Sequence, residues 1–174
     1  MAIGRVYNVD SGSTTGVTVG STTPGSEFVL MFGQTVQEFN ISAVRVGTYS
    51  GSSASYPSNG SITWRLRRVS GAIQAGLQGG TGSAYSIGQS TTAPQSTWYY
   101  STLTNATGTI ATYGAILWEQ TIPCTAGANW GEWFTPGFEL NAGPGQGTVA
   151  ITYEYGAAGT SSAVNLMAGL VISE

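Results

Sequence analysis

Apolar and polar residues alternate along most of the chain, the pattern of β-strands that bury one face. The stretch 148–155, TVAITYEY, is the clearest case. Its apolar face consists of Val149, Ile151, Tyr153 and Tyr155. The stretches 61–69 (SITWRLRRV) and 163–172 (AVNLMAGLVI) alternate in the same way. In 39–47 (FNISAVRVG) the apolar phase shifts by one position, which predicts a β-bulge.

Further strands are expected wherever the alternation recurs. They are 3–9, 15–20, 27–33, 97–103, 108–122 and 130–140. Only 70–80 (SGAIQAGLQGG) carries a helical spacing, between Ile73 and Leu77, and Gly76 interrupts it, so at most one turn is expected there. Clusters of Gly, Ser, Thr, Asn and Pro separate the strands and predict turns.

This series of elements predicts an all-β fold of eight to ten antiparallel strands in a single domain, residues 1–174. Such a number of strands forms either a two-sheet sandwich or a closed barrel. The long connections at 47–61 and 70–96 favour the Greek-key crossings of a jelly roll, so a jelly-roll-like antiparallel β-sandwich is our prediction. Residues 1–14 are polar and are expected to form an extended N-terminal arm.

Charge changes this picture in two ways. Charged residues make up only 7% of the chain, and all five basic residues are arginine, with no lysine or histidine. Schiff-base chemistry and the Ser-His and Cys-His dyads are therefore excluded. Residues 1–87 carry a net charge of +2 and residues 88–174 a net charge of −5. We expect one patch of each sign, which suits contact with other protein subunits better than sequence-specific binding of nucleic acid.

Cys124 is the only cysteine, so neither a disulfide framework nor a zinc cluster is expected, and we predict a small, partly buried apolar residue. The first residues show no signal peptide, and no apolar run approaches the roughly 20 residues that span a bilayer. We therefore expect a soluble protein without a membrane partner.

The stretch 117–140 (LWEQTIPCTAGANWGEWFTPGFEL) concentrates aromatic residues and carboxylates. Alternation places Trp118 in the core together with Ile116 and Ile122. It places Trp133 and Glu139 on the face opposite the aromatic row of residues 130, 134 and 138.

Glycosidase chemistry needs two carboxylates that face each other, roughly 5–9.5 Å apart. Glu119 and Glu139 are expected to point outward, and Glu132 to be either charge-paired or at the rim of the sheet. The chain also lacks a phosphate-binding glycine loop and a calcium loop. We predict that it is not an enzyme and has no catalytic, cofactor-binding or metal-binding residue.

Two binding roles remain open for the exposed side chains. Trp133, with Tyr99 and Tyr100, could stack on sugar rings, while an exposed tryptophan is also typical of a protein interface, which we favour. Arg65 and Arg67 share one strand face and could pair with acidic residues of a neighbouring subunit. The predicted interface residues are Arg65, Arg67, Trp133 and Glu139.

The segment WEQTIPCTAGANWGEWFTPGFEL, followed by the final strand SAVNLMAGLVISE, resembles the C-terminal half of small, β-rich structural proteins of tailed bacteriophages. The resemblance covers the last third of the chain. These proteins include capsid cement and decoration proteins. The resemblance implies an accessory shell protein, often trimeric, bound where major capsid subunits meet.

Residues and resemblance together predict a bacteriophage structural protein, most simply a capsid cement or decoration protein located in the virion and assembled in the host cytoplasm. Its expected partners are the major capsid protein or other virion subunits, and copies of itself. The alternative is a carbohydrate-binding or receptor-binding module, such as a phage tail tip or an extracellular lectin-like domain, with a glycan as partner.

Overall fold

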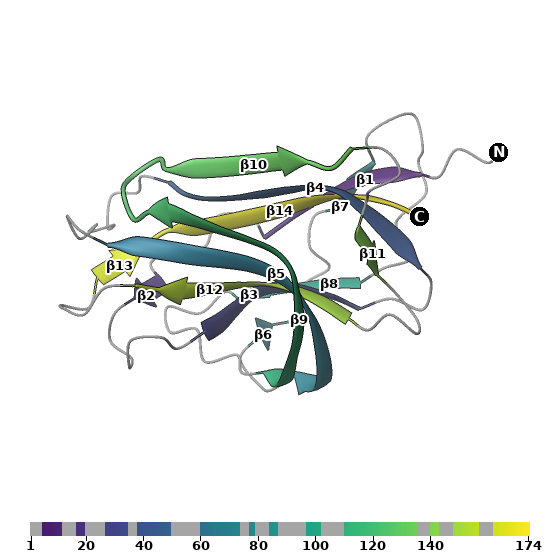
Figure 1. The fold of residues 1–174 in the computed structure, drawn as a ribbon, viewed down its shortest axis with the longest axis horizontal. Coiled ribbons are helices and arrows are strands. Elements are labelled where there is room, and N and C mark those ends of the chain that lie inside the picture. The colour runs from purple at the N-terminus through teal and green to yellow at the C-terminus, as the bar shows by residue number, and fades with distance from the viewer. Residues whose placement is uncertain are drawn as a thin grey trace.

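The structure is a computed structural model. It describes residues 5–11, 17–19, 27–34, 38–49, 60–73, 77–78, 84–86, 97–101, 110–135, 140–142, 148–156 and 162–174. Every regular element in these ranges is a β-strand, which confirms the predicted all-β class. The same ranges contain no helix of the length and hydropathy needed to cross a bilayer. Two layers of strands lie face to face, and strand β1, the first described strand, lies beside β14, the last (Figure 1).

The first layer, called sheet I here, is antiparallel and has the order β10-β4-β14-β1-β7, with β11 also paired to β4. Its strands are β1 (Val6–Asp10), β4 (Phe39–Thr48), β7 (Ala84–Ser86), β10 (Asn129–Trp133), β11 (Leu140–Ala142) and β14 (Leu166–Ser173). The pairs of β10 and β11 with β4 use successive parts of that strand, so both lie along one edge of it.

The second layer, sheet II, is also antiparallel, with the order β6-β8-β3-β12-β5-β9. Its strands are β3 (Glu27–Gln34), β5 (Ser61–Ile73), β6 (Leu77–Gln78), β8 (Thr97–Ser101), β9 (Ile110–Pro123) and β12 (Thr148–Tyr155). A separate pair joins β2 (Val17–Val19) to β13 (Ser162–Val164).

Eight of these strands follow the jelly-roll path. The order β1-β14-β4-β10 in sheet I faces the order β3-β12-β5-β9 in sheet II, and the chain crosses between the sheets as the two Greek keys of a jelly roll require. The six other strands contain two to five residues each. This topology confirms the predicted antiparallel sandwich and makes it a jelly roll.

The core lies between the sheets and is filled by the apolar phase of each strand. In β12 the predicted face is buried throughout. The largest fully buried side chains include Trp64, Trp98, Tyr7, Tyr153, Leu30, Met31, Ile41 and Leu170. Trp98 of sheet II meets Phe39 of sheet I edge to face, with ring centroids 5.6 Å apart. Because both sheets contribute to one apolar cluster, they stabilise each other.

Two local predictions concern strand irregularities. The phase shift in 39–47 is a bulge, because the pairing of β4 with β14 skips Ser42, which brings Ile41 and Val44 both into the core. The helical spacing in 70–80 forms no helical turn in its described part, since β5 continues to Ile73 and β6 begins at Leu77. Strand pairing here overrides a weak local signal.

The predicted N-terminal arm is wrong for residues 6–10. Strand β1 lies between β14 and β7 inside sheet I, and Tyr7 and Val9 are buried in the core. Backbone hydrogen bonds of 2.9 Å in both directions between Arg5 and Glu174 extend this pairing. Residues 1–4 and 12–14 of the predicted arm lie outside the described residues.

Candidate functional site

Of the four predicted interface residues, the structure places three and brings only two of them together. Arg65 and Arg67 lie on β5, with their side chains on the outer face of sheet II. Trp133 is the last residue of β10 in sheet I. Glu139 lies outside the described residues. That these residues contact a partner stays a prediction.

Arg65 is the centre of an ion-pair network within the chain. Its Nε donates to Oε2 of Glu119 on β9, and its Nη1 donates to Oε2 of Glu154 on β12, each at 2.6 Å. Oε2 of Glu27 on β3 lies 3.5 Å from the same Nη1. Strand register explains the first contact, because Arg65 lies directly opposite Glu119.

Arg67 closes the network at its other end. Its Nη1 donates to Oε2 of Glu27, and its Nη2 donates to the carbonyl of Gly114 at 2.8 Å. The guanidinium also lies 4.7 Å from the ring centroid of Tyr113. The Tyr113 hydroxyl donates to the Glu27 carbonyl at 3.1 Å, and the buried Thr152 hydroxyl donates to the Glu27 carboxylate. Glu27 thus has partners on three sides.

Electrostatics agree with this geometry. Partial burial by itself lowers the pKa of the Arg65 guanidinium, but the hydrogen bonds to Glu154 and Glu119 and the charge of Glu27 outweigh it, so that pKa is raised. The pKa of the Tyr113 hydroxyl is also raised, by burial first and by the charge of Glu27 second. Both groups therefore keep their protons at neutral pH.

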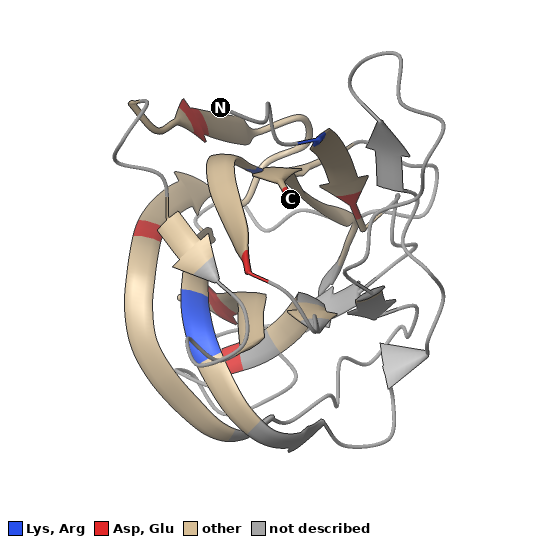
Figure 2. Cartoon of the chain, turned by 90° about the vertical axis from the view of Figure 1, so that its right-hand side faces the viewer, with Lys and Arg blue, Asp and Glu red and all other residues tan. Residues whose placement is uncertain are grey.

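The expected separation into one patch of each sign does not occur on this face. Figure 2 shows the arginine positions of β5 beside acidic positions of the neighbouring strands. Glu119 and Glu154 come from the negative half of the sequence and Arg65 from the positive half, and strand pairing brings them together. The two arginines pair with carboxylates of their own chain, a role that sequence reasoning missed.

The connection from β9 to β10 leads from sheet II to sheet I along one edge of the sandwich. Trp118, only 8% exposed, is in the core as predicted, and its indole Nε1 donates to Oε2 of Glu132 at 2.7 Å. Among the described contacts, Glu132 pairs neither with an arginine nor with another carboxylate. It accepts a hydrogen bond that fixes β10 against β9.

The prediction that Ile116 shares the core face of Trp118 is wrong. Pairing of β9 with β5 skips Leu117, so Ile116 lies opposite Arg67 on the outer face and is 48% exposed. Leu117 instead packs partly buried against the core. A bulge within a run of three apolar residues causes this reversal, because it changes the phase by one.

Among the side chains whose burial is described, the two exposed tryptophans both lie on strand β10. All five of its residues are exposed, with Trp133 at 70% and Trp130 at 44%. Trp133 faces outward as predicted, opposite Ala43 of β4. Tyr99 and Tyr100 lie on β8 of sheet II, a different sheet from that of Trp133. That the three residues form a sugar platform stays a prediction.

Cys124 directly follows β9, at the start of the connection to β10, and is fully buried. Its backbone N–H donates to the carbonyl of Gly60 at 2.8 Å. Burial raises the pKa of its thiol to about 11. The thiol is therefore a packed apolar group, more buried than the sequence suggested, and not a nucleophile at neutral pH.

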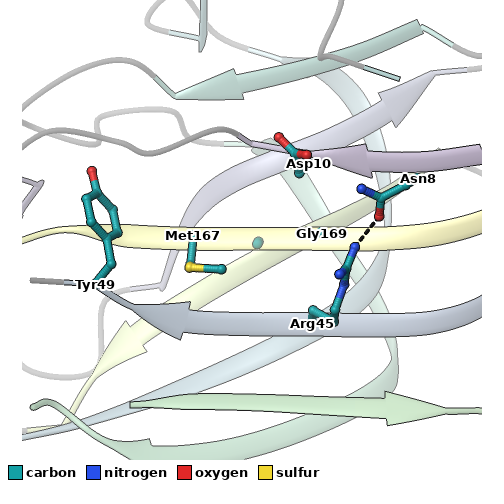
Figure 3. Close-up of a pocket in the computed structure, with 7 residues that line it drawn as sticks. Asn8, Asp10, Arg45, Tyr49, Met167 and Gly169 are labelled. Carbon is teal, nitrogen blue, oxygen red and sulfur yellow. Dashed lines mark hydrogen bonds between the residues drawn. The ribbon is translucent and has the colours of Figure 1, made fainter. Parts of the chain in front are cut away.

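A shallow trough of about 350 Å³ lies on the outer face of sheet I. Its sides are formed by Asn8, Asp10, Arg45, Tyr49 and Met167, and its floor by Gly169 (Figure 3). The Arg45 guanidinium donates to the side-chain oxygen of Asn8. Sequence reasoning singled out none of these residues, because they come from three strands far apart in the chain.

No group of three or more potential metal ligands occurs in the part of the chain that the structure describes. Its best-formed carboxylate cluster, around Arg65, is held by guanidinium groups. The comparisons with known proteins add no further assignment, since no protein-family model and no curated protein matches the chain.

Proposed function

We propose that this chain is a structural subunit of a virus particle, of the capsid cement or decoration type. It binds other virion subunits and copies of itself along the edge of sheet I formed by β10. The observation that carries this proposal is the full exposure of that strand with its two tryptophans. The virion assignment itself comes from the resemblance to small phage structural proteins.

The aromatic side chains of β10 supply the apolar area that an interface needs. A tryptophan buries about 150–250 Å² when it is covered, and tryptophan is enriched among the residues that dominate binding energy. Trp130 and Trp133 lie three positions apart, so alternation places them on opposite faces of this edge strand, and a neighbouring subunit that covers the edge can contact both.

The backbone of β10 adds a second means of contact. Among the described strands it pairs only with β4, so its other side presents hydrogen-bonding groups along the edge of sheet I. A strand of a neighbouring subunit can continue the sheet at such an edge. A closed homo-oligomer, which the resemblance suggests is a trimer, would cover three of these edges at once.

The internal charge pairing of sheet II agrees with a binding role elsewhere. Arg65 and Arg67 already hold three carboxylates of their own chain, so that face needs no partner to satisfy its charges. With 7% charged residues in the whole chain, little charge has to be desolvated when a neighbour packs against β10.

The oligomeric part of the proposal is tested by sedimentation velocity of the intact protein and of the variants Trp130→Ser and Trp133→Ser. Ile116→Ser is the matched control, because Ile116 is 48% exposed but lies on sheet II. We expect an oligomer for the native chain and the control, and a shift toward monomer for both tryptophan variants. A native monomer at all concentrations, or equal behaviour of all variants, contradicts assembly through β10.

The virion part is tested with purified particles made with and without the protein. We expect it to copurify with particles in a fixed number of copies, and particles that lack it to fail at lower temperature or at low salt. Equal resistance of both kinds of particle contradicts the cement role even if the chain is an oligomer.

A further inference from the structure

We propose that the trough on the outer face of sheet I is a binding site for a neutral saccharide. The site is independent of the interface proposed for β10, and it uses other residues than the aromatic platform suggested by the sequence. It would give a virion surface protein a second activity, recognition of glycans.

The trough exists because glycine interrupts a row of side chains. In the strand register Arg45 of β4 lies opposite Gly169 of β14, which in turn lies opposite Asp10 of β1. Adjacent strands are about 4.8 Å apart, so the outer two residues of this row are separated by roughly 10 Å at the backbone. The middle position has no side chain, which leaves the space between them open.

A side chain at the position of Gly169 would crowd strand β1. A Cβ atom there would lie 3.2 Å from the carbonyl oxygen of Val9 and 3.5 Å from Cβ of Asp10. The first distance is tighter than ordinary contacts, so even alanine would push against β1. Larger side chains would also occupy the trough itself.

Backbone contacts hold both ends of the trough in place. At one end Ser11 donates its N–H to the carbonyl of Ala168 at 2.8 Å and accepts the N–H of Ala168 on Oγ at 3.0 Å, which fixes Asp10 beside β14. At the other end the Tyr49 N–H donates to the carbonyl of Asn165 at 3.2 Å. A site built on paired strands in this way needs little ordering when a ligand binds.

The chemistry of the walls selects the class of ligand. The Arg45 guanidinium only donates hydrogen bonds, the Asp10 carboxylate only accepts them, and the amide of Asn8 does both. Sugar hydroxyls can do both and so can form a hydrogen bond with each of the three groups. A simple anion would be repelled by Asp10 and a simple cation by Arg45, so the opposite charges favour a neutral ligand.

The trough also offers apolar contact. Met167 is 41% exposed and lies in the trough wall, and the ring of Tyr49 stands at its end (Figure 3). Aromatic rings and thioethers pack against the C–H faces of pyranose rings. A volume of about 350 Å³ is at the small end of ligand sites, which suits one or two sugar rings.

The test is a nuclear magnetic resonance titration of the intact protein with methyl glycosides of glucose, galactose and mannose, each raised to roughly 20 mM, to detect dissociation constants on the order of 1 mM. Sodium phosphate and glycine serve as the anionic and zwitterionic probes. We expect at least one glycoside to shift the amide signals of residues 8–10, 45–49 and 167–169, and neither small ion to do so.

Variants then locate the site. Asp10→Asn keeps the size of the side chain and Arg45→Gln shortens it, and both remove the charge and change the hydrogen bonding, so each should weaken glycoside binding about tenfold. Trp133→Ala is the matched control on the same sheet and should bind as the native chain does. The proposal is overturned if no glycoside binds, if phosphate or glycine binds in its place, or if Trp133→Ala abolishes binding while Asp10→Asn keeps it.

Discussion

The outer faces of the two sheets differ in how their side chains are arranged. On sheet II the charged side chains of β3, β5, β9 and β12 bind one another, and Arg65 alone contacts three glutamates. On sheet I the row through Gly169 lacks a central side chain, and the edge strand exposes two tryptophans. The same jelly roll therefore has one face whose charged side chains pair within the chain, and one with a trough and two exposed tryptophans at its edge.

This difference shows why a cluster of charges is a poor guide to a binding surface. Arg65 and Arg67 are the most evident basic cluster in the sequence, but they are 17% and 14% exposed and are held by their own chain. On sheet I, by contrast, two tryptophans of the edge strand are exposed and a glycine leaves a gap in a row of side chains. The following predictions test that contrast.

The largest effect is expected from Arg65→Ala. It leaves Glu27 and Glu154 close together without the guanidinium between them, and should lower the free energy of unfolding by about 2–3 kcal/mol, as urea denaturation would measure. Arg45→Ala on sheet I is the control and should cost less than about 0.5 kcal/mol. Equal losses in the two variants would mean that the faces do not differ in this way.

The next effect concerns the thiol between the sheets. Because the pKa of Cys124 is raised to about 11 in the folded chain, from about 8.5 in an unfolded one, the folded state keeps a proton that the unfolded state loses. The thiol's contribution to stability is thus complete below pH 8.5 and is lost as the pH rises toward 11. Its slope is at most about 1.4 kcal/mol per pH unit.

Denaturation of the native chain and of Cys124→Ala between pH 7 and 11 measures this contribution. Their difference in unfolding free energy should be constant below pH 8 and shrink above it. A difference that stays constant up to pH 11 would show that the thiol does not titrate with folding.

A smaller effect is expected from Thr152→Val. This change removes the hydroxyl that donates a hydrogen bond to the Glu27 carboxylate in the ion-pair network of sheet II. Since Thr152 is fully buried, the loss should be about 1–2 kcal/mol by thermal denaturation. Thr63→Val removes a hydroxyl that pairs with Thr121 at an exposed position, and should change stability by less than about 0.5 kcal/mol. If Thr63→Val lowers the stability as much as Thr152→Val does, the hydrogen bond to the ion-pair network is not the cause of the loss.

The smallest effect is expected at Glu132, whose hydrogen bond to Trp118 links β10 of sheet I to β9 of sheet II. Glu132→Ala leaves the Trp118 indole without its acceptor and should cost about 1 kcal/mol, while Glu132→Gln keeps an oxygen there and should cost less than half of that. Tryptophan fluorescence during denaturation reports both. Identical losses would indicate that packing of the side chain, not the hydrogen bond, holds β10 to β9.

The fold was largely predictable from the sequence because alternation defines which face of a strand is buried. The pattern in 148–155 matches the buried face of β12, and the phase shift in 39–47 predicted a bulge, which the structure places at Ser42. The bulge at Leu117 was not predictable. Three apolar residues in succession fit either phase, and only pairing with β5 decides between them.

The candidate site was much less predictable, because it depends on which strands are neighbours. Arg65 and Glu119 are 54 residues apart in the chain, and the register of β5 and β9 brings them together. Asp10 and Arg45 face each other only because β14, the last strand, lies between theirs. In the sequence, Gly169 reads as a weak position in a strand, whereas in the sheet it forms the floor of the trough.

The most direct test of the contrast between the faces is amide hydrogen exchange of the dilute chain compared with the chain assembled on particles. We predict that assembly slows exchange in residues 129–133 of β10. Exchange in residues 112–119 of β9 should stay unchanged, because the charged side chains on the outer face of sheet II already pair within the chain. Slower exchange in residues 112–119 with no change in 129–133 would contradict the account.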